Sequence, residues 1–146
     1  MHLAQINVAR LLRPLDDPAT ADFVAALAPV NAIADASPGF VWRLQTEGGD
    51  ATAIRVADDD LVIVNLTVWE SLAALRGFVF SGDHLAVLRR RREWFEKLAT
   101  PASALWWIEA GALPAPDEGM ARLATLAEHG PTKEAFTFAQ TFEPDV

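Results

Sequence analysis

The segment Leu61–Trp69 constrains the fold more than any other part of this sequence. It is rich in Val, Ile and Thr, which favour extended backbone, and it therefore predicts a strand. Because successive side chains of a strand point to opposite faces of a sheet, the segment has two distinct faces. One face carries Val62, Val64, Leu66 and Val68, and the other carries Ile63, Asn65, Thr67 and Trp69. The second face thus mixes large apolar groups with polar ones.

Alternation and helical spacing place further elements on both sides of this strand. Leu3–Ala9 alternates apolar and polar residues and predicts the first strand. Asp17 followed by Pro18 combines an N-cap residue with proline at the first helical position, which predicts a helix start. The other predicted elements are strands over Phe40–Thr46 and Ala104–Glu109, a hairpin arm over Thr52–Val56, and helices over Glu70–Val79 and from Ser81–Asp83 to about Leu98.

This order, β-α-β-β-α-β, is that of the ferredoxin-like α+β fold, a four-stranded antiparallel sheet with its helices on one face. We expect Leu3, Ile63 and Trp69 on the face that the helices leave open. Burying apolar surface stabilises a fold by about 25 cal/mol per Å². A second copy of the chain is therefore expected to seal that face, so the pattern predicts a homodimer whose two sheets enclose a cavity.

The predicted domain occupies residues 1–110. A stiff segment over residues 111–116, Gly-Ala-Leu-Pro-Ala-Pro, leads into a C-terminal extension over residues 111–146 that we expect to pack on the same domain. Within the extension, Asp117–His129 predicts a short helix, and the alternation in Phe136–Phe142 predicts a short strand.

Composition and charge exclude several classes of function. With 12 Lys+Arg against 20 Asp+Glu, the net charge of −8 disfavours a nucleic-acid-binding surface. The absence of Cys excludes disulfides, thiolate nucleophiles and Cys-ligated metals. The longest uncharged run, Phe23–Ala34, contains Pro29 and falls well short of the roughly 20 residues that span a bilayer. The first residues lack the pattern of a signal peptide, so we expect a cytoplasmic protein without a membrane segment.

One stretch resembles a known superfamily. Leu66–Leu75, followed by Phe78 and by Ser81-Gly82-Asp83-His84, is similar to the dimeric α+β barrel superfamily, which includes antibiotic-biosynthesis monooxygenases and heme-degrading monooxygenases. Their pattern is an apolar strand ending in Trp, a helix, and a small polar turn that carries His. The whole chain looks closest to an uncharacterised bacterial branch of that superfamily, a domain family of unknown function. The resemblance implies the fold and a homodimer more strongly than it implies a reaction.

The sequence departs from this pattern at two places. The resemblance places a His on the helix nine residues after the strand-end Trp, where this chain has Phe78. It places the iron-binding His of the heme-degrading members at Leu88, one helical turn after His84. We therefore expect no bound cofactor and keep heme as a disfavoured alternative. The three His residues also lack the spacing of a dedicated metal site, so none is predicted.

Candidate catalytic residues are His84 and Asn7. His84 lies near a helix N-terminus, where the macrodipole favours the neutral imidazole that a general base requires. It is otherwise a surface or capping histidine packed under Trp69. Asn7 matches the polar Asn that the resemblance places in the cavity. An unpartnered buried polar group costs about 1–3 kcal/mol, so polar strand residues predict a ligand, an interface network or ordered water. These are Gln5, Asn7, Asn65 and Thr67.

Arginines and tryptophans complete the candidate set. Arg43 either enters the cavity and binds an enolate, carboxylate or phenolate, or it lies solvated at the sheet edge. Trp42, Trp69 and Trp107 either line an apolar pocket for a planar ligand or belong to the core and the dimer interface. Trp107 and its neighbour Trp106 must point to opposite faces.

The run Arg89–Arg92 predicts a solvated helix face or a dimer contact more than an anion site. Arginines of this run and the acidic residues after it are four positions apart, which is the spacing of ion pairs on one helix. The expected pairs are Arg89–Glu93, Arg92–Glu96 and Glu93–Lys97.

Together these features favour a monooxygenase-like homodimer with one small apolar pocket per subunit. The resemblance implies oxygenation of a planar aromatic or polyketide-like substrate without a tightly held cofactor. The substrate would be deprotonated to an electron-rich anion that reacts with O₂. A non-enzymatic dimer that binds a small hydrophobic ligand, and a heme-binding or heme-degrading protein, are the alternatives.

Overall fold

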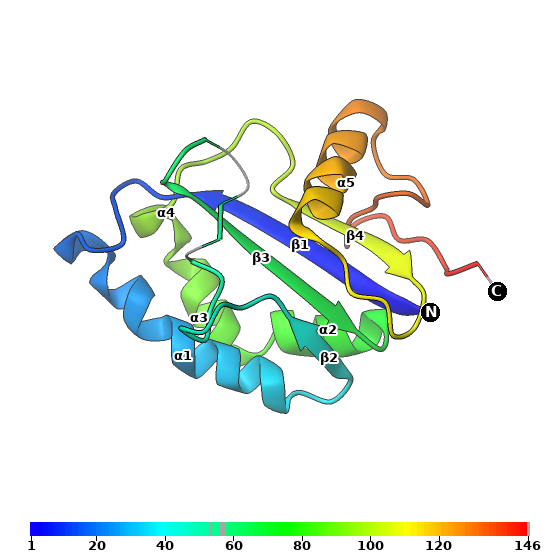
Figure 1. Cartoon of the computed structure of the whole chain (residues 1–146), viewed down its shortest axis with the longest axis horizontal. Coiled ribbons are helices and arrows are strands. Elements are labelled where there is room, and N and C mark those ends of the chain that lie inside the picture. The colour runs from blue at the N-terminus through cyan, green and yellow to red at the C-terminus, as the bar shows by residue number, and fades with distance from the viewer. Residues whose placement is uncertain (53, 56–57, 146) are drawn as a thin grey trace.

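The computed structural model describes residues 1–52, 54–55 and 58–145. Its centre is a four-stranded sheet in the order β2-β3-β1-β4, with each neighbouring pair antiparallel (Figure 1). The strands are β1 (His2–Arg10), β2 (Phe40–Arg43), β3 (Val62–Trp69) and β4 (Ser103–Ile108). This is the ferredoxin-like arrangement that the sequence predicts. The hairpin arm expected over Thr52–Val56 extends onto residues that lie outside the described ones.

Helices connect and cover the strands. The 3₁₀ turn η1 (Pro18–Thr20) starts at Asp17, whose carboxylate accepts the Ala19 N–H as the predicted cap, and α1 (Ala21–Ala36) follows with Pro29 inside it. The second crossover is α2 (Leu72–Val79), α3 (Gly82–Arg89) and α4 (Arg91–Trp94). Ser71 caps α2 by accepting the Ala74 N–H at 3.1 Å. The helix predicted from Ser81–Asp83 to about Leu98 is shorter than expected. It ends at Trp94 and is broken at Arg90 into α3 and α4.

The helices of the two crossovers cover the face that we expected to lie open. Leu3 and Trp69 are fully buried in one cluster with Leu75 of α2 and Ala34 of α1. Ile63 packs against a second cluster on the same side that contains Phe23. The prediction assigned the two alternating faces the wrong way round. Both faces of the strands are strongly apolar, so their composition does not say which one the helices take.

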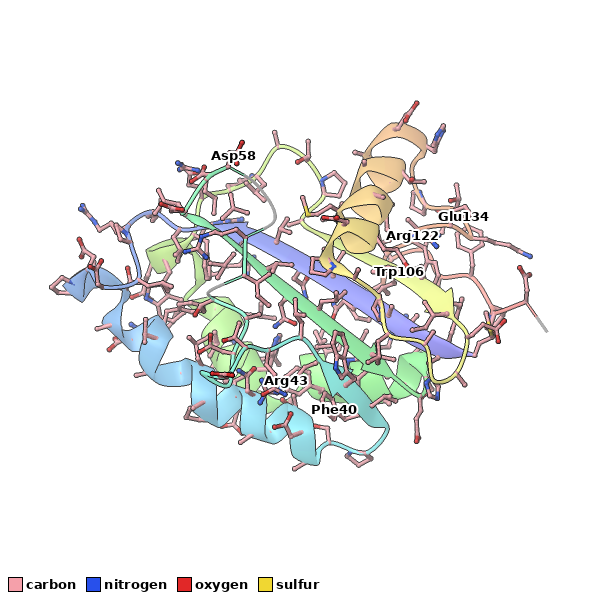
Figure 2. All side chains as sticks on the ribbon, in the orientation of Figure 1. Phe40, Arg43, Asp58, Trp106, Arg122 and Glu134 are labelled. Atoms are coloured by element: carbon pink, nitrogen blue, oxygen red, sulfur yellow. The ribbon has the colours of Figure 1, made fainter. Side chains whose placement is uncertain are left out.

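The opposite face is covered by the extension of the same chain. Helix α5 (Pro116–His129) lies over β4 and β1, apart from α1, α2 and α3 (Figure 1). Its Leu123 and Leu126 share a buried cluster with Ile6 and Trp106. Arg122 of α5 lies 5.7 Å from the Trp106 ring and pairs with Glu134 at 3.0 Å. Figure 2 labels these three residues. An attached helix thus supplies cover that we had expected from a second copy.

The predicted terminal strand is reduced to one bridge. Phe136 is fully buried and exchanges two backbone hydrogen bonds with Leu105 of β4, at 2.8 and 2.9 Å. Beyond it, Trp107 donates its indole N–H to the Phe142 carbonyl at 2.7 Å. The end of the chain is therefore attached to its own sheet by Phe136 and Trp107.

The packing of α5 depends on a glycine. A Cβ at Gly119 would lie 2.5 Å from Ile6 Cδ1 and 3.2 Å from Ile6 Cβ, so the helix would have to move away from β1. We expect Gly119→Ala to lower the free energy of unfolding by about 1–3 kcal/mol through overpacking. The control is Gly77→Ala in α2, where no atom lies within 4 Å and the same change should stabilise by about 0.4–1 kcal/mol. Urea unfolding measures both, and a Gly119→Ala protein as stable as the wild type would contradict this packing.

Candidate functional site

A band of polar side chains crosses the sheet on the side of α1–α3. The strand register places Asn7 of β1 between Asn65 of β3 and Ser103 of β4. The next row on the same face is Arg43–Thr67–Gln5–Leu105, and the row after that is the apolar Trp69–Leu3–Trp107. Because side chains on one face recur every second residue, these rows lie side by side. Four sequence-predicted polar residues, Gln5, Asn7, Asn65 and Thr67, are therefore neighbours on one surface.

This band is the floor of a cavity of about 690 Å³ between the sheet and the helices. Its apolar walls come mainly from α1 and α3, which contribute Phe23, Leu27, Val30, Val87 and Leu88. Predicted residues that line it are Gln5, Asn7, Arg43, Asn65, Thr67 and His84. The volume is in the range of pockets that hold small organic ligands. The cavity lies within one protomer, whereas we had expected the chamber between two sheets of a dimer.

The half-buried Asn7 and the exposed Asn65 have carboxamides that can bind a ligand. Gln5 donates to Ser103 Oγ at 3.5 Å, and Thr67 Oγ1 accepts the Trp69 indole N–H at 2.9 Å. Within the part of the chain that the structure describes, no hydrogen bond engages the side chain of Asn7 or Asn65. Two directly opposed carboxamides with unused donors and acceptors can bind an oxygen of a ligand in the cavity.

His84 lies at the start of α3, and its hydrogen bond fixes its tautomer. Nδ1 lies 2.9 Å from the Val79 carbonyl, which can only accept, so Nδ1 carries the proton. Burial lowers the pKa of the His84 imidazole from its ordinary value, and the bond to Val79 opposes this shift. The neutral ring therefore keeps the lone pair on Nε2. Its position is supported by Phe78, whose ring centroid is 4.9 Å away and which stacks on Trp69.

The lowered pKa of His84 predicts a pH dependence of stability. Below the unfolded-state value of about 6.5, the unfolded chain binds a proton that the folded imidazole resists. The free energy of unfolding should therefore fall as the pH drops through about 6.5 toward the lower pKa of the folded state. His84→Asn, which keeps a donor for Val79 but does not titrate, should lose less stability between pH 7.5 and 5.5. Urea unfolding at both pH values checks this, and equal losses in the two proteins would contradict it.

Arg43 lies at the cavity edge, but carboxylate and carbonyl oxygens already engage its guanidinium. Nε and Nη2 donate to the two oxygens of Asp35 at 2.7 and 3.2 Å, and Nη1 donates to the Gly49 carbonyl at 2.6 Å. Figure 2 shows Arg43 between β2 and α1. Its side chain is 13% exposed, which is intermediate between the two predicted placements. Arg43 therefore links the loop at Gly49 to α1 through hydrogen bonds. Each of its three guanidinium nitrogens already donates to a protein oxygen, so none is left to bind an anion.

The three candidate tryptophans do not line the cavity. Trp69 is fully buried beneath it, between Phe40 and Phe78. Trp107 is half-buried beside Phe136, in the apolar row beyond the polar band. Trp42 is paired with Val68 and packs on the α5 side of the sheet. As predicted, Trp106 and Trp107 point to opposite faces. These three tryptophans therefore belong to the core or pack against it.

The two positions at which the resemblance places histidines carry no metal-binding group in this chain. Phe78 and Leu88, where the resemblance places the histidines of related enzymes, both line the cavity as hydrocarbon side chains, which cannot ligate iron. Among the described residues, no group of three or more His, Cys, Asp or Glu could hold a metal ion. The same residues include no helix long and apolar enough to cross a membrane.

Arg91, Arg92 and Lys97 line one end of the cavity. The sequence disfavoured an anion site in this run, and it predicted that Arg92 pairs with Glu96 and Lys97 with Glu93 along a continuous helix. The helix is broken at Arg90, and none of the three expected ion pairs forms among the described residues. No Gly or Pro marks this break in the sequence.

A family model and several solved structures match this chain. The family model is the domain of unknown function DUF3291, and it matches residues 2–146. No curated protein matches. SnoaB, a cofactor-independent oxygenase from Streptomyces nogalater, is 20% identical with a TM-score of 0.52, over 78% of this chain and 98% of that chain. Rv0793 from Mycobacterium tuberculosis is 18% identical with a TM-score of 0.56, over 77% of this chain and 100% of that chain.

A third similar structure is a Nitrosomonas europaea protein described as a candidate antibiotic biosynthesis monooxygenase. It is 16% identical with a TM-score of 0.53, over 76% of this chain and 93% of that chain. At these identities the likeness establishes the fold, and the family model establishes the family. This chain therefore belongs to the DUF3291 family and has the ferredoxin-like α+β fold of antibiotic-biosynthesis-monooxygenase-like proteins.

Proposed function

We propose that this chain is a cytoplasmic, cofactor-independent monooxygenase that oxidises a small planar aromatic or polyketide-like substrate. The observation that carries the proposal is the cavity of about 690 Å³ in which a neutral imidazole and two unpartnered carboxamides meet apolar walls. The likeness to SnoaB, a cofactor-independent oxygenase, supports the same class of chemistry.

His84 is the proposed base. Its Nε2 lone pair takes a proton from an activated methylene group of the substrate, and the Val79 carbonyl stabilises the resulting imidazolium through Nδ1–H. Burial lowers the pKa of His84, so the imidazole is unprotonated and available at neutral pH. A base with a fixed tautomer needs no reorganisation before it accepts the proton.

Asn7 and Asn65 are the proposed anion-binding groups. Deprotonation leaves negative charge on the substrate oxygen conjugated with the methylene carbon, and carboxamide N–H donors aimed at that oxygen stabilise it. The electron-rich carbanion then transfers electrons to O₂ and forms a C–O bond, and the resulting peroxide anion takes the proton back from the His84 imidazolium, giving a hydroperoxide. Loss of water converts the hydroperoxide to a carbonyl, so the balance is R₂CH₂ + O₂ → R₂C=O + H₂O. The substrate supplies the electrons, so no external reductant is required.

The proposed assembly is a homodimer, as the dimeric α+β barrel resemblance implies. Half-buried apolar side chains of β2 and the residue after it, Val41, Trp42 and Leu44, lie on the α5 side of the sheet and offer contact surface. Native mass spectrometry tests this. A species at twice the chain mass of 15.9 kDa is expected, and only the single-chain mass at micromolar concentration would contradict the dimer.

Oxygen uptake tests the proposed reaction. 1,8-Dihydroxyanthrone is a suitable probe because its methylene group is acidic and its oxidation to 1,8-dihydroxyanthraquinone changes its absorbance. The protein should accelerate this oxidation with one O₂ consumed per quinone formed, in buffer without added metal or reductant. A rate equal to that of the uncatalysed reaction would contradict the oxygenase. Tight binding of the probe without turnover would instead support the non-enzymatic ligand-binding dimer.

A further inference from the structure

One end of the cavity carries a cluster of cations, Arg91, Arg92 and Lys97, which we call the cationic edge. All three are exposed and line the cavity, and they come from α4 and the loop that follows it. Arg91 donates from Nη1 to the Leu88 carbonyl at 3.0 Å, which positions its guanidinium. In the described part of the chain, no carboxylate lies within ion-pair distance of these three side chains. Unpaired cations are notable in a chain with a net charge of −8.

Nearby acidic groups make their hydrogen bonds and ion pairs with residues other than those of the cationic edge. Glu96 also lines the cavity, but Arg10 binds it at 3.0 Å. Asp50, the other carboxylate of the lining, accepts hydrogen bonds from the N–H and hydroxyl of Thr52. Glu93 and Asp22 both bind Arg90, whose guanidinium lies over the Trp94 ring. The break at Arg90 thus directs the acidic partners to Arg90 and leaves Arg91 and Arg92 unpaired.

The cationic edge and His84 lie at opposite ends of α3. The Trp94 carbonyl accepts the Leu12 N–H, and the Arg10 carbonyl accepts the Glu96 N–H, which places α4 beside the end of β1. His84 instead packs on Phe78, next to the row that contains Trp69. Helix α3, Gly82–Arg89, is about 12 Å long at 1.5 Å per residue, and His84 lies within its first turn. A ligand of three fused rings that carries a carboxylate can bridge most of this length, with a hydrogen bond at each end.

From this geometry we infer that the cavity binds an aromatic compound with an anionic group such as a carboxylate. The rings lie over the Asn7–Asn65 row, and the carboxylate lies at the cationic edge, at the other end of α3 from His84. Guanidinium groups bind carboxylates through two parallel N–H donors, and cations at the mouth of an apolar cavity attract an anion toward it. This inference deepens the proposed function and rests on it, since it names the class of substrate.

Two fluorescent probes that differ in one charged group test the inference. 8-Anilinonaphthalene-1-sulfonate is anionic, whereas N-phenyl-1-naphthylamine has the same aromatic skeleton without the sulfonate. In Arg91→Gln/Arg92→Gln/Lys97→Gln, the Kd of the anionic probe should rise about tenfold, as expected for the loss of several exposed charge contacts. The Kd of the neutral probe should stay within about twofold. Arg89→Gln is the matched control, because this neighbouring arginine is outside the cavity lining, and it should leave both values unchanged.

A blocking variant locates the probes and separates the two proposals. Ala26→Trp, on the cavity wall of α1, should weaken the binding of both probes. If the neutral probe binds and is blocked by Ala26→Trp, but the triple variant leaves the anionic probe unchanged, this inference is wrong and the proposed function stands. If neither probe binds the wild type, or Ala26→Trp affects neither, the cavity does not take an arene and both proposals fail. Equal losses in Arg89→Gln and the triple variant would also overturn the inference.

Discussion

Replacement of His84 by Ala is expected to reduce kcat for 1,8-dihydroxyanthrone by about 10²–10⁴-fold, the range for loss of a positioned general base. The imidazole is the one group in the cavity that combines a fixed tautomer with a free basic nitrogen in the described residues. His84→Asn should lose a similar factor while keeping a donor for the Val79 carbonyl. This variant distinguishes loss of the base from loss of the hydrogen bond. Steady-state oxygen uptake and quinone absorbance give kcat and KM.

Asn7→Ala should lower kcat by about 10²–10³-fold, as removal of an oxyanion donor does, with a smaller effect on KM. The control is His129→Ala, because that histidine is exposed at the end of α5. All of these variants should keep the oligomeric mass of the wild type. Unchanged turnover in both His84→Ala and Asn7→Ala would remove the two residues from the mechanism.

Trp69→Ala is expected to lower the free energy of unfolding by about 3–5 kcal/mol, the range for truncation of a fully buried aromatic side chain. Trp69 has no exposed surface, stacks on Phe78 at 5.3 Å, contacts Phe40 edge to face at 5.4 Å, and donates to Thr67 Oγ1. Because Phe78 supports His84, the variant should also weaken catalysis under conditions in which it stays folded. Urea unfolding followed by circular dichroism measures the stability.

Two further variants provide comparisons for the loss of stability in Trp69→Ala. Trp69→Phe keeps the stacking on Phe78 and should recover part of the loss, while leaving the buried Thr67 hydroxyl without its donor at a cost of about 1–3 kcal/mol. Trp42→Ala truncates a half-buried tryptophan on the opposite face and should destabilise less than Trp69→Ala. Equal destabilisation by Trp69→Ala and Trp42→Ala would show that the cluster beneath the cavity is not the better-packed one.

The strand faces were predictable, whereas the side covered by the helices was not. Alternation places Gln5 and Asn7 with Leu3, and Asn65 and Thr67 with Trp69, and the observed register keeps both groupings. It contains no information on which face the helices take, because both faces can form a core. The packing of α5 on the sheet could not be predicted either. It depends on a close contact between Gly119 and Ile6, which are more than a hundred residues apart in the sequence.

The candidate site could be predicted only where a side chain belonged to regular structure. Asn7 and Asn65 were found because polar groups interrupt apolar strand faces, and His84 because it follows a capping turn. The cationic edge was disfavoured as an anion site because ideal helical spacing assigned Arg92 and Lys97 to ion pairs, and these pairs do not form on the helix broken at Arg90. Arg43 remained ambiguous because its partners, Asp35 and Gly49, belong to a helix and a loop whose placement depends on the tertiary fold.

A crystal structure of the protein with 1,8-dihydroxyanthraquinone, the product of the probe reaction, tests the central claim most directly. We predict that the ring system lies inside one protomer between α1 and the polar band, with a quinone oxygen within hydrogen-bond distance of Asn7 or Asn65 and with His84 at its edge. Density for the quinone on the α5 side of the sheet, between two copies, or a cavity closed by its own side chains, would contradict that claim.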